Sequence, residues 1–197
     1  MTRLGLLGGT FDPPHYGHLV AAQEAACQLD LERVLFLTAR QNPLKRSEPI
    51  SDAETRCEMV RLAIADNPRF TLSRLELERP APSFTVDLLR GLASAERELF
   101  FLAGADVLPE LPRWHAPLEI LSLARLVVVT RPGSPAPDLE RLERDLPGAS
   151  ARVSVLRIPG VEVSSTELRL RVKQGASIRY LTPDAVERFI AERRLYR

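Results

Sequence analysis

Two histidines lie three residues apart in the glycine- and proline-rich segment LLGGTFDPPHYGHL, residues 6–19. Gly8 and Gly9 follow an apolar run and leave bare backbone N–H groups, which an anion can approach closely. If a helix begins between His15 and His18, both rings lie at its N-terminal end, whose partial positive charge favours phosphate. Imidazole rings donate hydrogen bonds to phosphate oxygens and add positive charge when they are protonated. The segment therefore predicts a phosphate-binding site.

Two other interpretations of this segment stay open at this point. It can be a tight strand-to-helix turn in which a histidine merely caps the helix. It can also be a zinc site, although zinc needs more ligands than two histidines, and no cysteine or carboxylate lies at a supporting spacing. The spacing matches neither the Walker pattern nor G-x-G-x-x-G. Glycines, prolines and histidines concentrated in so short a segment favour the phosphate site.

A second candidate for phosphate binding is SST, residues 164–166, directly before the helical pattern ELRLRV. Hydroxyl groups at a helix N-terminus cap its first turn, and the free N–H groups beyond them bind anions. Ser164 or Ser165 can therefore be a simple helix cap. Arg169, one turn into the helix, favours a functional interpretation because its guanidinium can reach the same anion.

The chain around these residues alternates between strand-like and helix-like patterns. Strands are predicted from apolar or alternating runs at residues 3–8, 33–39, 69–77, 98–104, 125–131 and 151–158. Helices are predicted from their periodicity and start signals at residues 17–29, 51–66, 83–93, 116–123, 165–173 and 183–194. Apolar strands that alternate with helices indicate a parallel sheet covered on both faces. We therefore expect an α/β, doubly wound, Rossmann-like fold.

The helix predicted over residues 51–66 carries its own start signal. Ser51 is followed three residues later by Glu54, the pattern of a capping box. Met59, Leu62 and Ala63 share one face of this helix, and we expect that face to be buried.

In a doubly wound fold, ligands bind beyond the carboxyl ends of the strands. Gly104 ends one predicted strand and is followed by Asp106, which can accept hydrogen bonds from ribose hydroxyls or cap the following turn. Arg131 follows another predicted strand. Trp114 is the only tryptophan. A lone tryptophan is more often a core residue than a stacking platform, but Trp114 lies in the polar, proline-flanked loop LPRWHAP, so both interpretations stay open.

Length and composition set further limits. A chain of 197 residues suits one domain, residues 1–197, and a net charge of +1 gives no global field for nucleic acid or a membrane surface. No apolar run approaches the roughly 20 residues of a membrane span. The N-terminal residues lack a signal pattern, so we expect a cytoplasmic protein. Cys27 and Cys57 have no metal or redox spacing, and we expect both to be buried.

The segment GGTFDPPHYGHL resembles the signature of the nucleotidyltransferase superfamily, in which a T/H-x-G-H element binds the triphosphate of a nucleotide. Its sequence is most similar to that of the bacterial nicotinate-nucleotide adenylyltransferases. Later segments resemble this family in the same order: PSFTVDLL (82–89), FFLAGADVLPELPRW (100–114), VTRPG (129–133), VEVSSTELR (161–169) and YLTPDAVERFI (180–190). The resemblance covers essentially the whole chain.

The resemblance implies adenylyl transfer from ATP to nicotinate mononucleotide, which forms nicotinate adenine dinucleotide and pyrophosphate. It implies contacts to the triphosphate from His15 and His18, over a floor lined by Gly8, Gly9, Thr10 and Phe11. It assigns the leaving pyrophosphate to Lys45, Ser165, Thr166 and Arg169, the rest of the ATP site to Gly104, Asp106 and Arg131, and the mononucleotide to Asn42, Thr85 and Trp114. The part of the chain over residues 164–197 would complete the phosphate site.

The chain departs from the family pattern at one position and leaves other points open. The family often has histidine directly before the lysine that corresponds to Lys45, whereas this chain has Leu44.

No dedicated carboxylate cluster is evident, so we expect Mg²⁺ to be held mainly by the phosphates and no metal site on the protein. The alternatives are an acceptor such as nicotinamide mononucleotide or phosphopantetheine, a regulator without turnover, or a synthetase-like fragment. The oligomeric state is not predicted.

Overall fold

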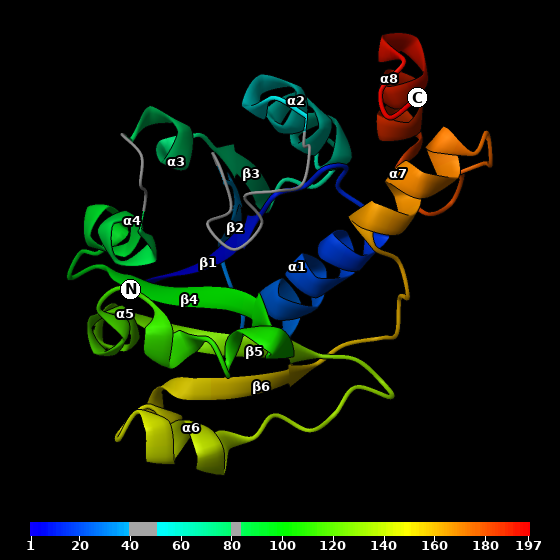
Figure 1. The fold of residues 1–197 in the computed structure, drawn as a ribbon. Helices are drawn as coiled ribbons and strands as arrows, with labels where there is room; N and C mark the ends of the chain where they lie inside the picture. The colour runs from blue at the N-terminus through cyan, green and yellow to red at the C-terminus, as the bar shows by residue number, and fades with distance from the viewer. Residues whose placement is uncertain (40–50, 80–83) are drawn as a thin grey trace.

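Six strands form one parallel sheet in a computed structural model, which describes residues 1–39, 51–79 and 84–197 (Figure 1). The strand order is β3-β2-β1-β4-β5-β6. The strands are β1 (Thr2–Gly9), β2 (Arg33–Thr38), β3 (Phe70–Ser73), β4 (Arg97–Gly104), β5 (Ala124–Thr130) and β6 (Val153–Arg157). The order reverses between β1 and β4, which is the switch point of a doubly wound sheet. The fold predicted from the sequence is confirmed.

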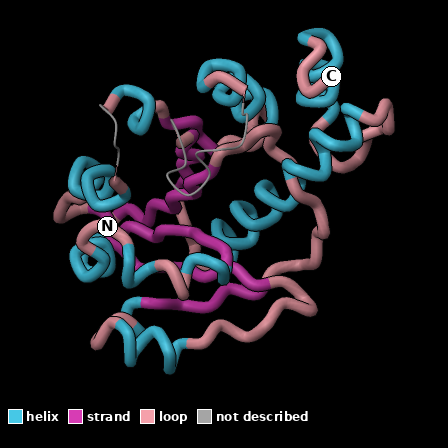
Figure 2. Tube along the Cα trace, viewed as in Figure 1, coloured by secondary structure: helices cyan, strands magenta, loops and turns pink. Residues whose placement is uncertain are grey.

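Helices cover both faces of this sheet (Figure 2). One apolar core joins it to α1 (Tyr16–Gln28), α2 (Ala53–Ala63), α7 (Ser165–Lys173) and α8 (Asp184–Arg193). A second core, on the other face, joins it to α4 (Thr85–Leu92), α5 (Pro117–Leu123) and α6 (Leu139–Asp145). The short helix α3 (Leu75–Glu78) follows β3. In Figure 1, α7 lies between α1 and α8, so the C-terminal helices lie near the start of α1.

The continuous apolar runs in the strands follow from this two-sided burial. In β1, Leu6 belongs to the core beneath α4 and α5, whereas its neighbour Leu7 belongs to the core beneath α1 and α2. In β4, Phe100 and Phe101 divide in the same way. Successive side chains of a strand point to opposite faces, so a strand buried on both faces must be apolar at every position.

Several local predictions were wrong. The strand predicted over residues 69–77 ends at Ser73, because the following residues turn into α3. Helix α6 was not predicted, since it has seven residues of which only Leu142 is buried. The N-cap of α2 is Asp52 rather than Ser51, and its side chain accepts a hydrogen bond from the N–H of Thr55.

The two cysteines lie in different environments. Cys57 is buried as predicted, whereas Cys27 is exposed on α1, where its sulfur accepts a hydrogen bond from Gln23. Residue type alone favours burial of cysteine, but the orientation of α1 decides this position. Among the residues described, no helix is long and apolar enough to cross a membrane.

Candidate active site

The glycine turn at the end of β1 is closed by a buried aromatic ring. Phe11 is 1 % exposed and adopts a positive φ of 50°. A Cβ at Gly9 would lie 2.8 Å from the Phe11 ring, so only glycine permits this close approach. The ring of His18 meets Phe11 edge to face at 5.0 Å between centroids. Phe11 therefore forms the floor under the turn and under one of the two histidines.

The two histidines stack on each other at the start of α1. His15 is the N-cap residue, and its ring centroid lies 3.7 Å from that of His18 at an interplanar angle of 28°. A Cβ at Gly17 would lie 2.9 Å from His15 Nδ1, so glycine at this position makes room for the ring. The backbone N–H of His15 donates to His18 Nδ1 over 3.2 Å. This bond puts the proton of a neutral His18 ring on Nε2.

Both rings are held in the neutral form. Burial, and then the charge of Arg131, lower the pKa of His15 to about 4. Burial, and then the charge of His15, lower the pKa of His18 well below its usual value. The buried His15 Nδ1 has no hydrogen-bond partner within the described part of the chain. A phosphate group beside these rings would reverse the electrostatic effect, because a negative charge favours protonated imidazole.

Side chains from the C-terminal part of the chain hold three successive carbonyl groups of this loop, those of Asp12–Pro14. Arg169 donates to the first over 2.9 Å, Ser165 to the second over 2.8 Å, and Thr182 to the third over 2.7 Å. Ser165 begins α7, and Arg169 lies one turn further on. The two segments that the sequence predicts as phosphate sites are therefore joined directly. Ser165 and Pro13, which share one of these bonds, are 152 residues apart in the chain.

The ends of β4 and β5 add polar groups to the same edge of the sheet. Gly104 pairs with Val129 of β5, and the carboxylate of Asp106 folds back against Gly104. Arg131 directly follows β5 and donates to the carbonyl of Val161 over 2.9 Å. Its positive charge also contributes to the lowered pKa of His15, so the guanidinium lies within electrostatic range of that ring.

Aromatic rings define the other end of the site. Trp114 meets Phe101 edge to face at 6.1 Å, and the Phe101 ring lies 3.9 Å from the position of a Cβ at Gly8. Beside them, His115 and Phe84 pair at 4.4 Å between ring centroids. Phe84 is the N-cap residue of α4, and Thr85 is the first residue of this helix. The structure thus brings Thr85 and Trp114 to neighbouring positions through the residues beside them.

Two predicted site residues, Asn42 and Lys45, lie outside the described residues, as does Leu44. Thr166 is described, and its hydroxyl accepts a hydrogen bond from Arg169 over 3.3 Å. Among the residues described, no group of three or more histidine, cysteine, aspartate or glutamate side chains is placed to hold a metal ion. The roles of the individual residues remain predictions.

Sequence reasoning missed a buried polar network behind the loop. Arg56 of α2 is 1 % exposed; it donates to the carbonyls of Thr10 over 2.9 Å and Ala39 over 2.7 Å. The Asp12 carboxylate accepts from the hydroxyl of Tyr196 over 2.5 Å. Burial, and then Asp12, raise the pKa of Tyr196, which keeps this hydroxyl protonated. The signal available in the sequence was the position of Arg56 three residues before Met59, on the inward face of α2.

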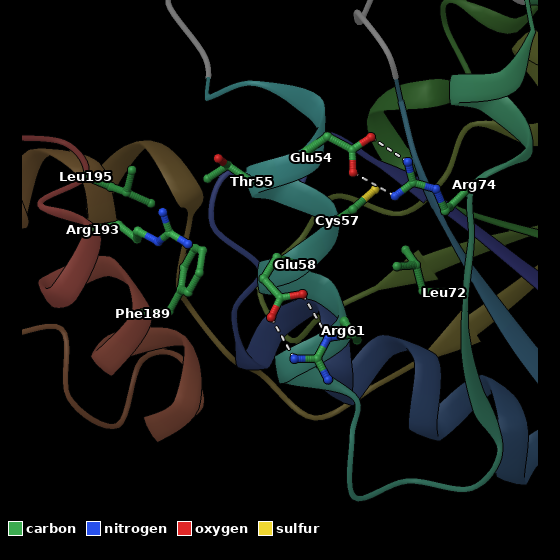
Figure 3. A pocket seen from close by; sticks show the side chains of 10 residues that line it. All are labelled: Glu54, Thr55, Cys57, Glu58, Arg61, Leu72, Arg74, Phe189, Arg193 and Leu195. Carbon is green, nitrogen blue, oxygen red and sulfur yellow. Dashed lines mark hydrogen bonds and ion pairs between the residues drawn. The ribbon is translucent and has the colours of Figure 1, made fainter.

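A cavity of about 710 Å³ lies on the outer side of α2, between this helix, β3 and the C-terminal segment (Figure 3). Four of its charged side chains form ion pairs, Arg61 with Glu58 at 2.6 Å and Arg74 with Glu54 at 2.5 Å, and Arg193 lies over the Phe189 ring. None of the residues that line it is a predicted site residue. The candidate active site is therefore the strand-end region around the histidine pair.

Comparison with known proteins agrees with this location. A family model described as cytidylyltransferase-like matches residues 6–171, so the chain belongs to this class of nucleotidyltransferases. The matched range includes the glycine turn, the histidine pair and Arg169.

Full-length relatives narrow the family. A protein of Roseiflexus sp. (strain RS-1) is 48% identical and the alignment covers 98% of each chain. A protein of Thermus thermophilus is 48% identical over 99% of this chain and 100% of its own. Both are named probable nicotinate-nucleotide adenylyltransferases. The chain belongs to the nicotinate-nucleotide adenylyltransferase family.

A solved structure shows the same fold. Plasmodium falciparum nicotinic acid mononucleotide adenylyltransferase complexed with NaAD superimposes with a TM-score of 0.79 at 16% identity, and the match covers 100% of this chain and 98% of that one. Strand order and helix layers are therefore shared across a wide sequence distance.

Proposed function

We propose that this chain transfers the adenylyl group of ATP to nicotinate mononucleotide, forming nicotinate adenine dinucleotide and pyrophosphate. The observation that carries the proposal is the stacked, neutral histidine pair at the start of α1, beside the glycine turn of β1. Relatives that are 48% identical over nearly the whole chain are named for this activity.

The reaction needs no base and no covalent intermediate on the enzyme. An oxygen of the mononucleotide 5′-phosphate forms a bond to the α-phosphorus of ATP, and the bond from that phosphorus to the bridging oxygen of the β-phosphate breaks. The nucleophile is already an anion, so the protein's task is to orient the two phosphates and stabilise the charge that develops on the transferred group.

The histidines suit this task on the triphosphate side. His18 offers a proton on Nε2, because its Nδ1 accepts from the backbone. His15 and Arg131 lie beside it, and the backbone of Gly9, Thr10 and Phe11 lines the floor. We assign the leaving pyrophosphate to the start of α7, with Ser165, Thr166 and Arg169. The region over residues 164–197 thereby completes the phosphate site.

The aromatic end of the site suits the acceptor. Trp114 supplies a face on which a pyridine ring can stack, and the first N–H groups of α4 near Thr85 can bind the nicotinate carboxylate. A neutral nicotinamide cannot use those donors as well, which would favour nicotinate. We assign the ribose hydroxyls of ATP to Asp106.

We expect Mg²⁺ to accompany ATP. The ion prefers oxygen ligands, and the Asp12 carboxylate is already engaged by Tyr196 and by the N–H of Ser51. Asp106 follows β4, and the described residues place no group of three or more potential metal ligands around it, which fits an ion held mainly by the phosphates of the nucleotide. When bound, Mg²⁺ neutralises part of the phosphate charge.

The cytoplasm is the compartment that the composition favours for this reaction.

A product assay tests the proposal. The protein is incubated with ATP and Mg²⁺ together with nicotinate mononucleotide, nicotinamide mononucleotide or phosphopantetheine in separate reactions. Dinucleotide formation is followed by chromatography and pyrophosphate by a coupled assay. We expect both products in equal amounts, and fastest with nicotinate mononucleotide. A faster reaction with another acceptor would reassign the substrate, and no product from any acceptor would overturn the proposed activity.

A further inference from the structure

The segment that precedes α8 contacts the backbone on both sides of His15. The N–H of Tyr16 donates to the carbonyl of Leu181 over 3.2 Å. The hydroxyl of Thr182 donates to the carbonyl of Pro14 over 2.7 Å. Thr182 is 0 % exposed, so this hydroxyl has left water entirely and its bond is a fixed part of the interior. The first two peptide groups at the start of α1 are therefore held from outside the helix.

The bond from Thr182 is also connected to the ring of His18. The carbonyl of Pro14 and the N–H of His15 belong to one planar peptide group, so fixing one fixes the direction of the other. This N–H donates to His18 Nδ1 over 3.2 Å. A neutral imidazole whose Nδ1 accepts a hydrogen bond carries its proton on Nε2. The hydroxyl of Thr182 and the ring of His18 are thus connected through a single peptide group.

We propose that Thr182 is a positioning residue for His18: through the Pro14–His15 peptide group it fixes the orientation and the protonated nitrogen of the ring that contacts the triphosphate. The inference that the ring contacts phosphate rests on the proposed function, whereas the connection from Thr182 to the ring does not. Because the pKa of His18 is lowered by burial, the ring is neutral before the nucleotide binds and can exist as either tautomer. The peptide group selects the tautomer with a free Nε2–H donor.

A pair of substitutions separates the hydroxyl from the shape of Thr182. Thr182→Val keeps the branched side chain but removes the donor, and Thr182→Ser keeps the donor. We expect Thr182→Val to lower kcat about tenfold, because small displacements of a catalytic group are costly, while the KM for the mononucleotide is unchanged. Thr182→Ser should restore kcat to within about twofold of the wild type, since its hydroxyl can make the same bond.

Nitrogen NMR of histidine-labelled protein gives a readout that does not depend on turnover. In the wild type, we expect the signals of His18 to be those of the tautomer with the proton on Nε2. In Thr182→Val they should shift toward a mixture of both tautomers, and in Thr182→Ser they should remain as in the wild type. If the wild type makes no product, the proposed function fails, but this measurement still decides the role of Thr182.

Thr130→Val is the matched control. Its hydroxyl is also buried and donates to a carbonyl, that of Leu156 at 3.3 Å within the sheet. We expect this variant to lose some thermal stability while kcat and the His18 tautomer stay unchanged. The proposal is overturned if Thr182→Val lowers only the melting temperature, or if Thr182→Ser is as impaired as Thr182→Val.

Discussion

The phosphate end and the acceptor end of the site are held together in different ways. At the phosphate end, the loop between β1 and α1 is fixed by hydrogen bonds to its own carbonyl groups. Arg56 of α2, Ser165 and Arg169 of α7, and Thr182 before α8 each supply such a bond. The donors come from three separate parts of the chain, and the loop between them is largely buried.

At the acceptor end, ring contacts take the place of these bonds. Trp114 packs edge to face against Phe101, and the exposed His115 pairs with Phe84, which is 37% exposed. Ring contacts tolerate small rotations, whereas a buried hydrogen bond to a carbonyl fixes a direction.

The difference matches what each end must do. Charge changes during the reaction on the phosphates, and donors stabilise it best when their orientation is fixed beforehand. The pyridine ring of the acceptor keeps its charge throughout, so its binding needs contact area rather than a fixed direction. Three changes should therefore have effects of different kinds at the two ends.

The largest effect is expected from His18→Ala. Loss of one preorganised donor to a developing charge should lower kcat by about 10²–10³-fold. The KM for the mononucleotide should hardly change, because the ring lies at the phosphate end, against Phe11. Steady-state kinetics with each substrate varied in turn measure both constants. An unchanged kcat would remove His18 from the mechanism.

A smaller effect is expected on stability when the pH is lowered. The pKa of His15 is about 4 in the folded protein against an ordinary value of 6.5, so the unfolded chain binds its proton first as the pH falls. The free energy of unfolding should fall between about pH 6.5 and pH 4, by at most about 3 kcal/mol from this group, and then level off.

Urea titrations from pH 7.5 to 4 measure this contribution, with His15→Asn as the control that cannot titrate. The difference in stability between the two proteins should change in favour of the variant as the pH falls. Saturating ATP should reduce the loss in the wild type, because phosphate favours protonated His15. A constant difference at every pH would show that His15 titrates alike in both states.

The same contrast explains how far the sequence could predict this molecule. The sheet, the helix layers and the meeting of residues 6–19 with the start of α7 could be predicted, because apolar periodicity and glycine-marked strand ends are local signals. The bond from Thr182 to Pro14 could not. It depends on which carbonyl turns inward, and residue type does not encode that direction.

The burial of Arg56 was not predicted, and its charge is the reason. Arginine is seldom fully buried, so an arginine on an amphipathic helix is normally assigned to its solvent face. Here the inward face of α2 contains Arg56 as well as Met59 and Val60, because carbonyl groups at the ends of β1 and β2 need donors. The prediction for Cys27 was wrong in the opposite direction. Cysteine usually favours burial, but Cys27 lies on the outer side of α1 and is exposed.

The smallest of the three effects is expected from Trp114→Ala. Loss of one stacking surface should raise the KM for nicotinate mononucleotide about tenfold, as stacked rings contribute roughly 1–3 kcal/mol. The KM for ATP should be nearly unchanged, since Trp114 packs against Phe101 at the acceptor end of the site. Phe84→Leu, at the exposed ring beside it, should raise the same KM by less than about threefold. An equal rise in the KM values for both substrates in Trp114→Ala would mean that the indole supports the fold of the whole strand-end region. The two ends of the site would then not be independent.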